Sequence, residues 1–273
     1  MSETEATRMD KQSERRNAIT DAVMSDGSVR ISDLAERFGI STMTVHRDLD
    51  ELEARGLLRK NRGVATALST VLVESSDLYR SSRNLEEKRT LARAALERIE
   101  PGQAIMIDDS TTSLQLVPHL QEKSPLTVIT NTLTVMNALR AIPGITLLGL
   151  GGEYYNWCSS YMGRMTTSAI SSLRADVLVM STSAITDGVA FHQTMDTVDV
   201  KRAMFDSAST RILLADHTKF DKRALHAMQP LADFDLVIVD AATKAEHIAD
   251  LRQKGVNVLV APRTRSASRG ERA

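Results

Sequence analysis

The chain has 273 residues, which is long enough for two domains that each bury a core. Its composition, with 42% hydrophobic and 25% charged residues, is that of an ordinary globular protein, and aromatic residues make up only 4%. The formal net charge of −1 excludes a global basic field, so any nucleic acid would have to be bound by a local basic patch.

Cysteine and histidine usage excludes further classes of site. The single cysteine, Cys158, excludes an intramolecular disulfide and a thiolate-rich cluster, and the six histidines lack zinc-site spacing. We therefore expect no metal and no cofactor. No apolar stretch approaches the roughly 18 residues of a membrane span, and the start of the chain is polar. These features predict a cytoplasmic protein without a membrane partner.

The first seventy or so residues carry a helical period. Apolar spacing predicts a first helix that stops at Gly27 and a second helix over Ser32–Phe38, which Gly39 breaks. Ser41 is placed to cap a third helix that runs to about Arg55. The buried face of this third helix is expected to contain Val45, Leu49 and Leu52.

A helix, a glycine-containing turn and a capped helix make the helix-turn-helix layout, whose second helix enters the major groove of DNA. The residues from Arg59 to Thr66 are predicted to form a hairpin, and basic residues gather there with no acid among residues 54–66. This local positive charge supplies the basic patch that a nearly neutral chain needs in order to bind nucleic acid. The predicted DNA-contacting residues are Ser41, Thr42, Thr44, His46, Arg47, Arg59, Lys60 and Arg62. The alternative is a three-helix interaction module with a solvated run of charge.

The domain organisation follows from changes in pattern. Residues 1–68 are predicted to form the winged helix-turn-helix domain, and residues 69–100 a serine-rich linker and a connecting helix over Asn84–Arg98. Residues 101–261 are predicted to form an α/β domain, and residues 262–273 a disordered tail.

Short apolar runs alternate with helical segments in the α/β domain. Their continuous apolarity indicates strands buried on both faces, hence a mainly parallel sheet with helices on each side. The predicted strands are Ala104–Ile107, Leu126–Ile129, Ile145–Leu148, Val177–Met180, Ile212–Ala215, Leu236–Val239 and Val256–Val260.

Polar residues and glycines follow several of these strands. Parallel sheets bind ligands at the carboxyl ends of their strands, where hydroxyl groups, a helix N-terminus and a lysine can hold a phosphate. The predicted ligand-binding residues are Asp108, Ser110, Thr111, Thr112, Thr130, Asn131, Gly151, Gly152, Ser183, Asp216 and Lys219. Taken singly, each has another interpretation: the Ser, Thr and Asp residues as helix caps, the glycines as turns, and the lysine as a solvated charge.

Several blocks resemble the DeoR-type bacterial transcriptional regulators. The blocks are Ile31–Leu49, Gly56–Arg59, Ile107–Thr112, Val128–Asn131, Gly149–Tyr155, Asp199–Met204 and Leu214–Phe220. The chain departs from the family pattern at His46, where a basic residue is usual, and in a wing that has a single glycine. It also has Ser110 where glycine is more frequent, and Ser183 in a block that commonly has an aspartate.

The resemblance implies a sensor domain related to ribose-5-phosphate isomerases and, more distantly, to CoA transferases. It also implies a repressor that binds double-stranded operator DNA as a homo-oligomer, either dimer or tetramer, and is released by a phosphorylated sugar. Two alternatives stay open. One is a sugar-phosphate isomerase or transferase fused to a DNA-binding module, with Asp108, Asp109, Asp187 or Asp216 as candidate bases. The other is a regulator whose second domain only oligomerises.

Overall fold

The computed structural model describes residues 3–54, 56–67, 77–81 and 83–262. Arg55, most of the predicted linker and the predicted tail beyond Pro262 lie outside these ranges. The chain divides into two compact units: unit 1 comprises Met1–Arg83 with Tyr154–Ser160, and unit 2 comprises Asn84–Glu153 with Tyr161–Ala273. Within the described ranges, no helix combines the length and the apolar character that crossing a membrane requires.

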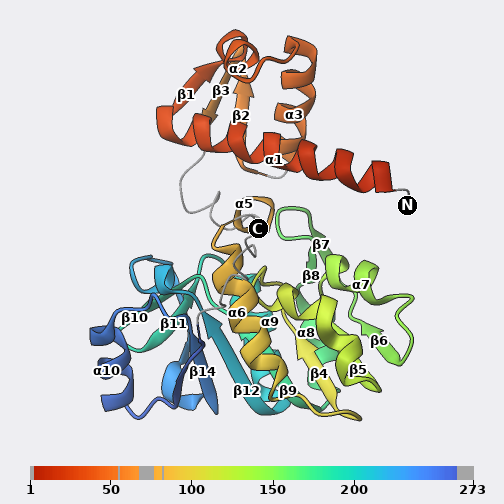
Figure 1. Cartoon of the computed structure of the whole chain (residues 1–273), viewed down its shortest axis with the longest axis vertical. Helices are drawn as coiled ribbons and strands as arrows, with labels where there is room; N and C mark the ends of the chain where they lie inside the picture. Colours follow the sequence, from red (N-terminus) through yellow and green to blue (C-terminus); the bar gives the residue numbers. More distant parts are fainter. Residues whose placement is uncertain (1–2, 55, 68–76, 82, 263–273) are drawn as a thin grey trace, which may run out of the picture. The chain divides into compact units, whose positions relative to one another are not determined.

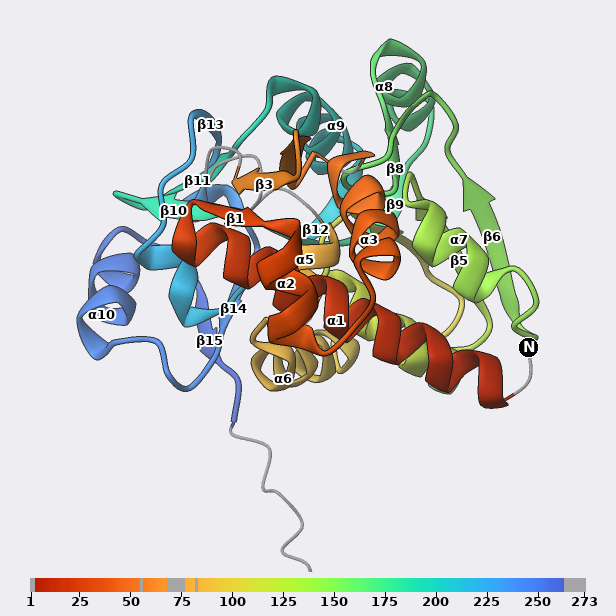
Figure 2. The same cartoon turned by 90° about the horizontal axis from the view of Figure 1, so that it is seen from above.

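Unit 1 has the predicted three helices and hairpin (Figures 1 and 2). Its elements are α1 (Glu3–Asp26), β1 (Ser28–Arg30), α2 (Ile31–Phe38), α3 (Thr42–Ala54), β2 (Leu58–Asn61), β3 (Val64–Ala67) and α5 (Asp77–Ser81). The strands form an antiparallel sheet in the order β1-β3-β2. The sequence did not predict β1, because a strand of three residues is too short to show an alternating pattern.

Apolar side chains from all three helices and from the sheet make the core of unit 1. Ile19 on α1, Leu34 on α2, and Leu49 and Leu52 on α3 are fully buried and belong to one cluster with Ala65 of β3. Burial of this common core fixes α3 against α1 and α2, which leaves its opposite side free for another molecule.

Unit 2 contains a seven-stranded sheet in the order β15-β14-β12-β9-β4-β5-β6, and every neighbouring pair is parallel. Its strands are β4 (Ala104–Ile107), β5 (Leu126–Thr130), β6 (Ile145–Gly149), β9 (Ala175–Ser181), β12 (Ala208–Ala215), β14 (Leu236–Val239) and β15 (Val258–Val260). The predicted parallel α/β architecture is therefore confirmed. Six of the predicted apolar runs lie within strands of this sheet, and the seventh, Val256–Val260, overlaps β15, which begins at Val258.

Helices cover both faces of the sheet, as Figure 1 shows. The helices of unit 2 are α6 (Leu85–Leu96), η1 (Ser113–Lys123), α7 (Leu133–Leu139), α8 (Arg164–Ser171), α9 (Met195–Asp206), η2 (His217–Phe220), η3 (Leu231–Asp233) and α10 (Ala245–Gln253). On one face, α6, η1 and α7 bury alternate strand residues such as Ile105, Val179 and Leu214. Helix α9 contacts β9 and β12, whose other alternate residues, among them Leu178 and Leu213, are equally buried. Burial on both faces explains why these strands are continuously apolar.

Two small sheets were not predicted. Strands β10 (Ala184–Thr186), β11 (Val189–His192) and β13 (His226–Pro230) form an antiparallel sheet in unit 2. Strand β7 (Glu153–Tyr155) pairs with β8 (Ser160–Met162). The segment η1, which follows the first predicted ligand loop, is a 3-10 helix with Pro118 inside it rather than an α-helix.

Gly152 has no room for a side chain. A Cβ atom at this position would overlap the hydroxyl of Thr166 and lie 2.7 Å from the carbonyl oxygen of Met162, whereas a Cβ at Gly151 would meet nothing within 4 Å. We expect Gly152→Ala to lower the free energy of unfolding by about 1–3 kcal/mol, the usual cost of overpacking, and Gly151→Ala to leave it nearly unchanged. Urea denaturation of both variants measures the difference; equal stabilities would contradict this account of Gly152.

Candidate functional site

The turn between α2 and α3 is fixed by backbone and side-chain caps. Gly39 is left-handed, at φ +62°, and its N–H bonds back to the end of α2. Ser41 then caps α3, because its Oγ accepts a hydrogen bond from the backbone N–H of Thr44 at 3.2 Å. The Ser41 and Thr44 hydroxyls also bond each other at 2.8 Å. The predicted cap is therefore present, and it engages two of the predicted DNA-contacting hydroxyls.

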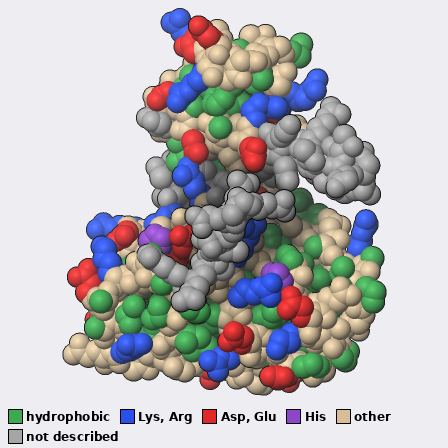
Figure 3. Space-filling model, viewed as in Figure 1, with side chains coloured by type: hydrophobic (Ala, Val, Ile, Leu, Met, Phe, Trp, Pro, Cys, Tyr) green, Lys and Arg blue, Asp and Glu red, His purple; other side chains and the backbone are tan. Residues whose placement is uncertain are grey.

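The outer side of α3 and the hairpin expose most of the predicted DNA-contacting residues. Thr42, Arg47, Arg59 and Arg62 are exposed, and His46 is half-buried. The tip of the β2–β3 hairpin turns at Arg62 and Gly63, which both have positive φ. Figure 3 shows Lys and Arg side chains at the surface of unit 1. The Lys60 ammonium already forms an ion pair with Asp50, so it offers less free charge than the arginines.

A buried carboxylate ties α1 to α3. Asp48 is 1% exposed, and its two oxygens accept hydrogen bonds from Nε of Arg15 at 2.6 Å and Nε of Arg16 at 3.1 Å. The hydrogen bond from Arg15 to Asp48 raises the pKa of Arg15 although its partial burial opposes this. Because Asp48 follows Arg47 directly, this pair of contacts sets the rotation of α3 and therefore the direction of its exposed side.

The second site lies in unit 2, at the carboxyl ends of the parallel strands. Asp108 to Thr112 follow β4, Thr130 and Asn131 end and follow β5, Ser183 follows β9, and Asp216 follows β12. These four strands are neighbours in the sheet, so the sequence prediction that their polar ends share one edge agrees with the topology. Gly151 and Gly152 follow β6, which is the edge strand on this side.

Two buried lysines face this edge from different elements. Lys88 on α6 is 3% exposed and donates to the hydroxyl of Thr111 at 3.1 Å. Lys219 in η2 is 9% exposed, and its Nζ lies 3.8 Å from Oδ2 of Asp216. Burial would raise the pKa of Asp216, but the charge of Lys219, hydrogen bonds from Thr218 and the charge of Lys88 together lower it below its usual value. The carboxylate of Asp216 is thus stabilised in its charged form by two lysines from different elements.

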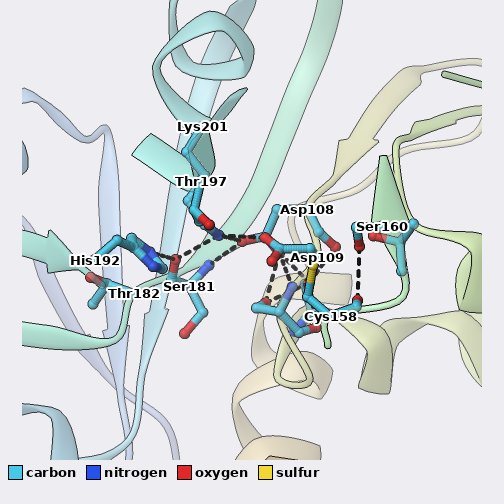
Figure 4. A network of polar contacts seen from close by, with 12 residues as sticks. Asp108, Asp109, Cys158, Ser160, Ser181, Thr182, His192, Thr197 and Lys201 are labelled. Carbon is cyan, nitrogen blue, oxygen red and sulfur yellow. Dashed lines mark hydrogen bonds and ion pairs between the residues drawn. The ribbon is translucent and has the colours of Figure 1, made fainter. Parts of the chain in front are cut away.

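A third buried lysine organises the loop after β4, as Figure 4 shows. Lys201 on α9 is 1% exposed; it donates to Asp108 and to the carbonyl oxygen of Ser181, and its Nζ lies 3.2 Å from Asp109. Burial lowers the pKa of Lys201, but the charges of Asp108 and Asp109 outweigh burial and raise it. Asp108 also accepts from the backbone N–H and hydroxyl of Ser110 and from the backbone N–H of Ser181. Its carboxylate is therefore occupied by protein groups.

The other predicted ligand-binding residues differ in how free they are. Asn131 donates from Nδ2 to the carbonyl oxygen of Tyr161 at 2.8 Å, while its buried Oδ1 accepts no hydrogen bond from the described residues. Thr130 accepts from the backbone N–H of Thr132 at 3.1 Å, as a turn residue would. The Ser183 hydroxyl lies 3.1 Å from Nδ1 of His192. Thr112 is buried and occupies the N-cap position of η1 without a side-chain cap bond. Asn131 is thus an open acceptor for a ligand hydroxyl.

The sequence analysis missed Lys88 and Lys201. Both lie on the apolar stripe of a helix: Lys88 is three residues from Leu85 and Leu91, and Lys201 is three residues from Val198 and Met204. A lysine at an inward helical position is buried only with a partner, so its spacing could have identified each as a charge-paired group. In the described part of the chain, no cluster of three or more His, Cys, Asp or Glu residues is arranged to hold a metal ion.

Comparisons with known proteins identify both domains. Residues 15–71 match the family model of the DeoR-like helix-turn-helix domain, and residues 83–241 match that of the DeoR C terminal sensor domain. The chain belongs to the DeoR family of transcriptional regulators. It therefore carries a DNA-binding domain and a sensor domain.

Relatives match this DeoR-family chain over nearly their whole length. The glycerol-3-phosphate regulon repressor of Escherichia coli strain K12 is 32% identical over 232 residues, which cover 85% of this chain and 92% of that protein. The lactose phosphotransferase system repressor of Lactococcus lactis subsp. lactis is 31% identical over 243 residues, covering 88% and 95%. Among solved structures, ribose 5-phosphate isomerase A from Methanocaldococcus jannaschii is similar at 12% identity and a TM-score of 0.37, over 50% of this chain and 55% of that one.

Removing the Lys201 ammonium would leave two buried carboxylates without their cation. We expect Lys201→Met to lower the free energy of unfolding at pH 7 by about 3–5 kcal/mol, because breaking a buried ion pair strands an uncompensated charge. The raised pKa of Lys201 means that its contribution is fully present below its unfolded pKa and is lost as pH rises through the folded value. Chemical denaturation at pH 7 measures the loss.

The matched control is Lys254→Met, which removes an exposed ion pair with Asp250. It should change the unfolding free energy by no more than about 0.5 kcal/mol. Similar values for the two variants would show that the Lys201 network contributes no special stability.

Proposed function

We propose that the protein represses a carbohydrate-metabolism operon and leaves its operator when a phosphorylated sugar binds at the carboxyl edge of the unit 2 sheet. Two findings support this function. The chain has a DeoR-type sensor domain, and it is similar to repressors named for glycerol-3-phosphate and lactose systems. The observation that carries the proposal is a pair of buried lysines at this edge: Lys88 donates to the hydroxyl of Thr111, Lys219 lies beside Asp216, and the charges of both lysines lower the pKa of Asp216.

The phosphate of the effector would bind Lys88 and Lys219. Buried ammonium groups donate strong charge-assisted hydrogen bonds to phosphate oxygens, and a dianion compensates their charge better than water does. The hydroxyls of Thr111 and Thr112 lie in the adjoining loop. The open Oδ1 of Asn131 suits a sugar hydroxyl. The same region includes Asp108, Ser110, Thr130, Gly151, Gly152 and Ser183, which we propose to shape the loops around the ligand.

The DNA site comprises the exposed side of α3 and the wing. Arg47 can donate to guanine or phosphate, Thr42 and the capping hydroxyls to phosphate, and Arg59 and Arg62 to the backbone beside the wing. His46 and Lys60 complete the proposed set. A homo-oligomer, dimer or tetramer, would present two such surfaces to neighbouring half-sites of an operator in the cytoplasm.

We propose the functional division predicted from the sequence, with DNA binding in residues 1–68, transmission through residues 69–100, effector binding in residues 101–261 and a tail in 262–273. The position of Lys88 on α6 changes this proposed division in one respect. The connecting helix would contribute directly to the effector site, so effector binding and transmission would share an element.

An enzymatic role is the second candidate, and the geometry does not favour it. Asp108 and Asp109 form ion pairs with Lys201, and Asp216 caps η2 beside Lys219, which with Lys88 lowers the pKa of Asp216, so none of these three carboxylates is a free base. We propose that the protein has no catalytic activity. Turnover of pentose or hexose phosphates by the purified protein would overturn the proposal that it has no catalytic activity.

Fluorescence-anisotropy titration of the full-length protein tests the proposed function. The probe is duplex DNA from upstream of its own gene, measured at fixed salt with and without a panel of sugar phosphates. Specific binding that one compound reverses is expected. Binding that no compound alters would overturn the sensor assignment, and failure to bind any fragment would overturn the operator assignment.

Arg47→Ala should weaken operator binding about 5- to 150-fold, as expected for the loss of one arginine contact to a base. Arg140→Ala, which removes an exposed arginine of unit 2, is the control and should bind the operator normally. Both should keep the wild-type affinity for the effector in isothermal titration calorimetry. Unchanged operator affinity in the Arg47 variant would remove this residue from the interface.

Lys219→Ala and Lys88→Ala should keep operator affinity but need about 10- to 150-fold more effector for release, because each loses one charge-assisted hydrogen bond. Lys244→Ala, whose side chain is 58% exposed, should respond normally. The readout is the effector concentration that halves the anisotropy signal, with thermal unfolding as the check on folding. A normal response of both variants would exclude the proposed phosphate site.

A further inference from the structure

The DNA-facing helix of unit 1 carries a large apolar side chain that the core does not use. Met43, the second residue of α3, is 68% exposed. It is the one large hydrophobic residue up to position 67, among those whose exposure the structure describes, that projects into solvent. Exposed apolar residues are unremarkable singly, so its position decides whether it has a role.

Helical geometry places Met43 in line with Arg47. The buried residues Val45, Leu49 and Leu52 define the inward side of α3, and at 100° per residue Met43 points almost directly away from them. Arg47 follows four residues later on the same outward side and is exposed. The rotation of α3 that the Asp48 contacts fix therefore presents a methionine and an arginine together.

The first turns of a recognition helix meet base edges in the major groove. The edges offer hydrogen-bond donors and acceptors to polar side chains, and one apolar group, the 5-methyl of thymine. A methionine gains from burying that methyl and is flexible enough to follow it. It cannot pair with the polar edges.

We propose that Met43 contacts the 5-methyl group of a thymine in each operator half-site and thereby selects T over C at that position. The proposal rests on the proposed DNA site and adds a specificity-determining residue to it. Four residues of α-helix rise about 6 Å, and base pairs stack about 3.4 Å apart, so this thymine lies about one or two base pairs from the base that Arg47 contacts.

Replacing thymine by deoxyuridine removes the methyl group and nothing else. Full-length protein would first select its preferred duplex from a random library, and each thymine of that duplex would then be replaced singly. At one position per half-site, the replacement should weaken wild-type binding about fourfold, the effect of one buried methyl. Met43→Ala should bind the thymine and deoxyuridine duplexes equally at that position.

Met43→Leu should keep the preference for thymine, because leucine is also apolar. Met165→Ala is the matched control: it removes a methionine that is 74% exposed on α8, and it should keep the full wild-type discrimination. Wild-type binding that is indifferent to every replacement, or a penalty of the same size in Met43→Ala, would overturn the role of Met43 alone. Failure of the wild-type protein to select any duplex would overturn the proposed DNA site together with it.

Discussion

Compensation of buried charge is the constraint on which unit 2 depends. The carboxyl edge of its sheet buries Lys88, Lys201 and Lys219 together with Asp108, Asp109 and Asp216, from segments far apart in the chain. Each of these groups loses its hydration, so its charged form persists only beside an opposite charge. The pairings divide the edge into two parts. Around Lys201, the ammonium forms ion pairs with Asp108 and Asp109. Around Asp216, the charges of Lys219 and Lys88 favour the ionised carboxylate. A phosphate bound at the proposed effector site would share Lys88 and Lys219 with Asp216.

Unit 1 uses a buried ion pair for a different purpose. Asp48 forms ion pairs with Arg15 and Arg16. The free energy lost by desolvating a buried ion pair is comparable to that gained from its attraction, so such a pair adds little net stability. The contacts of Asp48 fix the rotation of α3 about its own axis. A helix held by apolar contacts alone can rotate by small amounts at little cost in free energy. The hydrogen bonds fix which residues of α3 point outward. Among these residues are Arg47, with its guanidinium group, and Met43, with its apolar side chain.

The sequence predicted the large features because they rest on long or repeated patterns. Seven continuous apolar runs gave the parallel strands, and cap, turn and period gave α2 and α3. Strand β1 and the sheet of β10, β11 and β13 were missed because segments of three to five residues are too short to show an alternating pattern and contain polar residues as well as apolar ones. The 3-10 helix η1, of 11 residues, could not be distinguished from an α-helix either, since both place apolar residues three or four apart.

The candidate effector residues show a similar limit. Their place at the strand ends followed from the sequence, but which of them retain an unused donor, acceptor or charge depends on contacts across the fold. Ser110 and Asp108 bond each other, Thr130 completes a turn, and Gly152 is required by the packing of Thr166. Substituting any of these would alter the loop and the ligand response together. Lys88 and Lys219 are different, because they reach the edge from the helical segments α6 and η2. In the proposed site a phosphate would compete with Asp216 for these two cations, so the carboxylate whose charge the lysines stabilise would also help to release the anion.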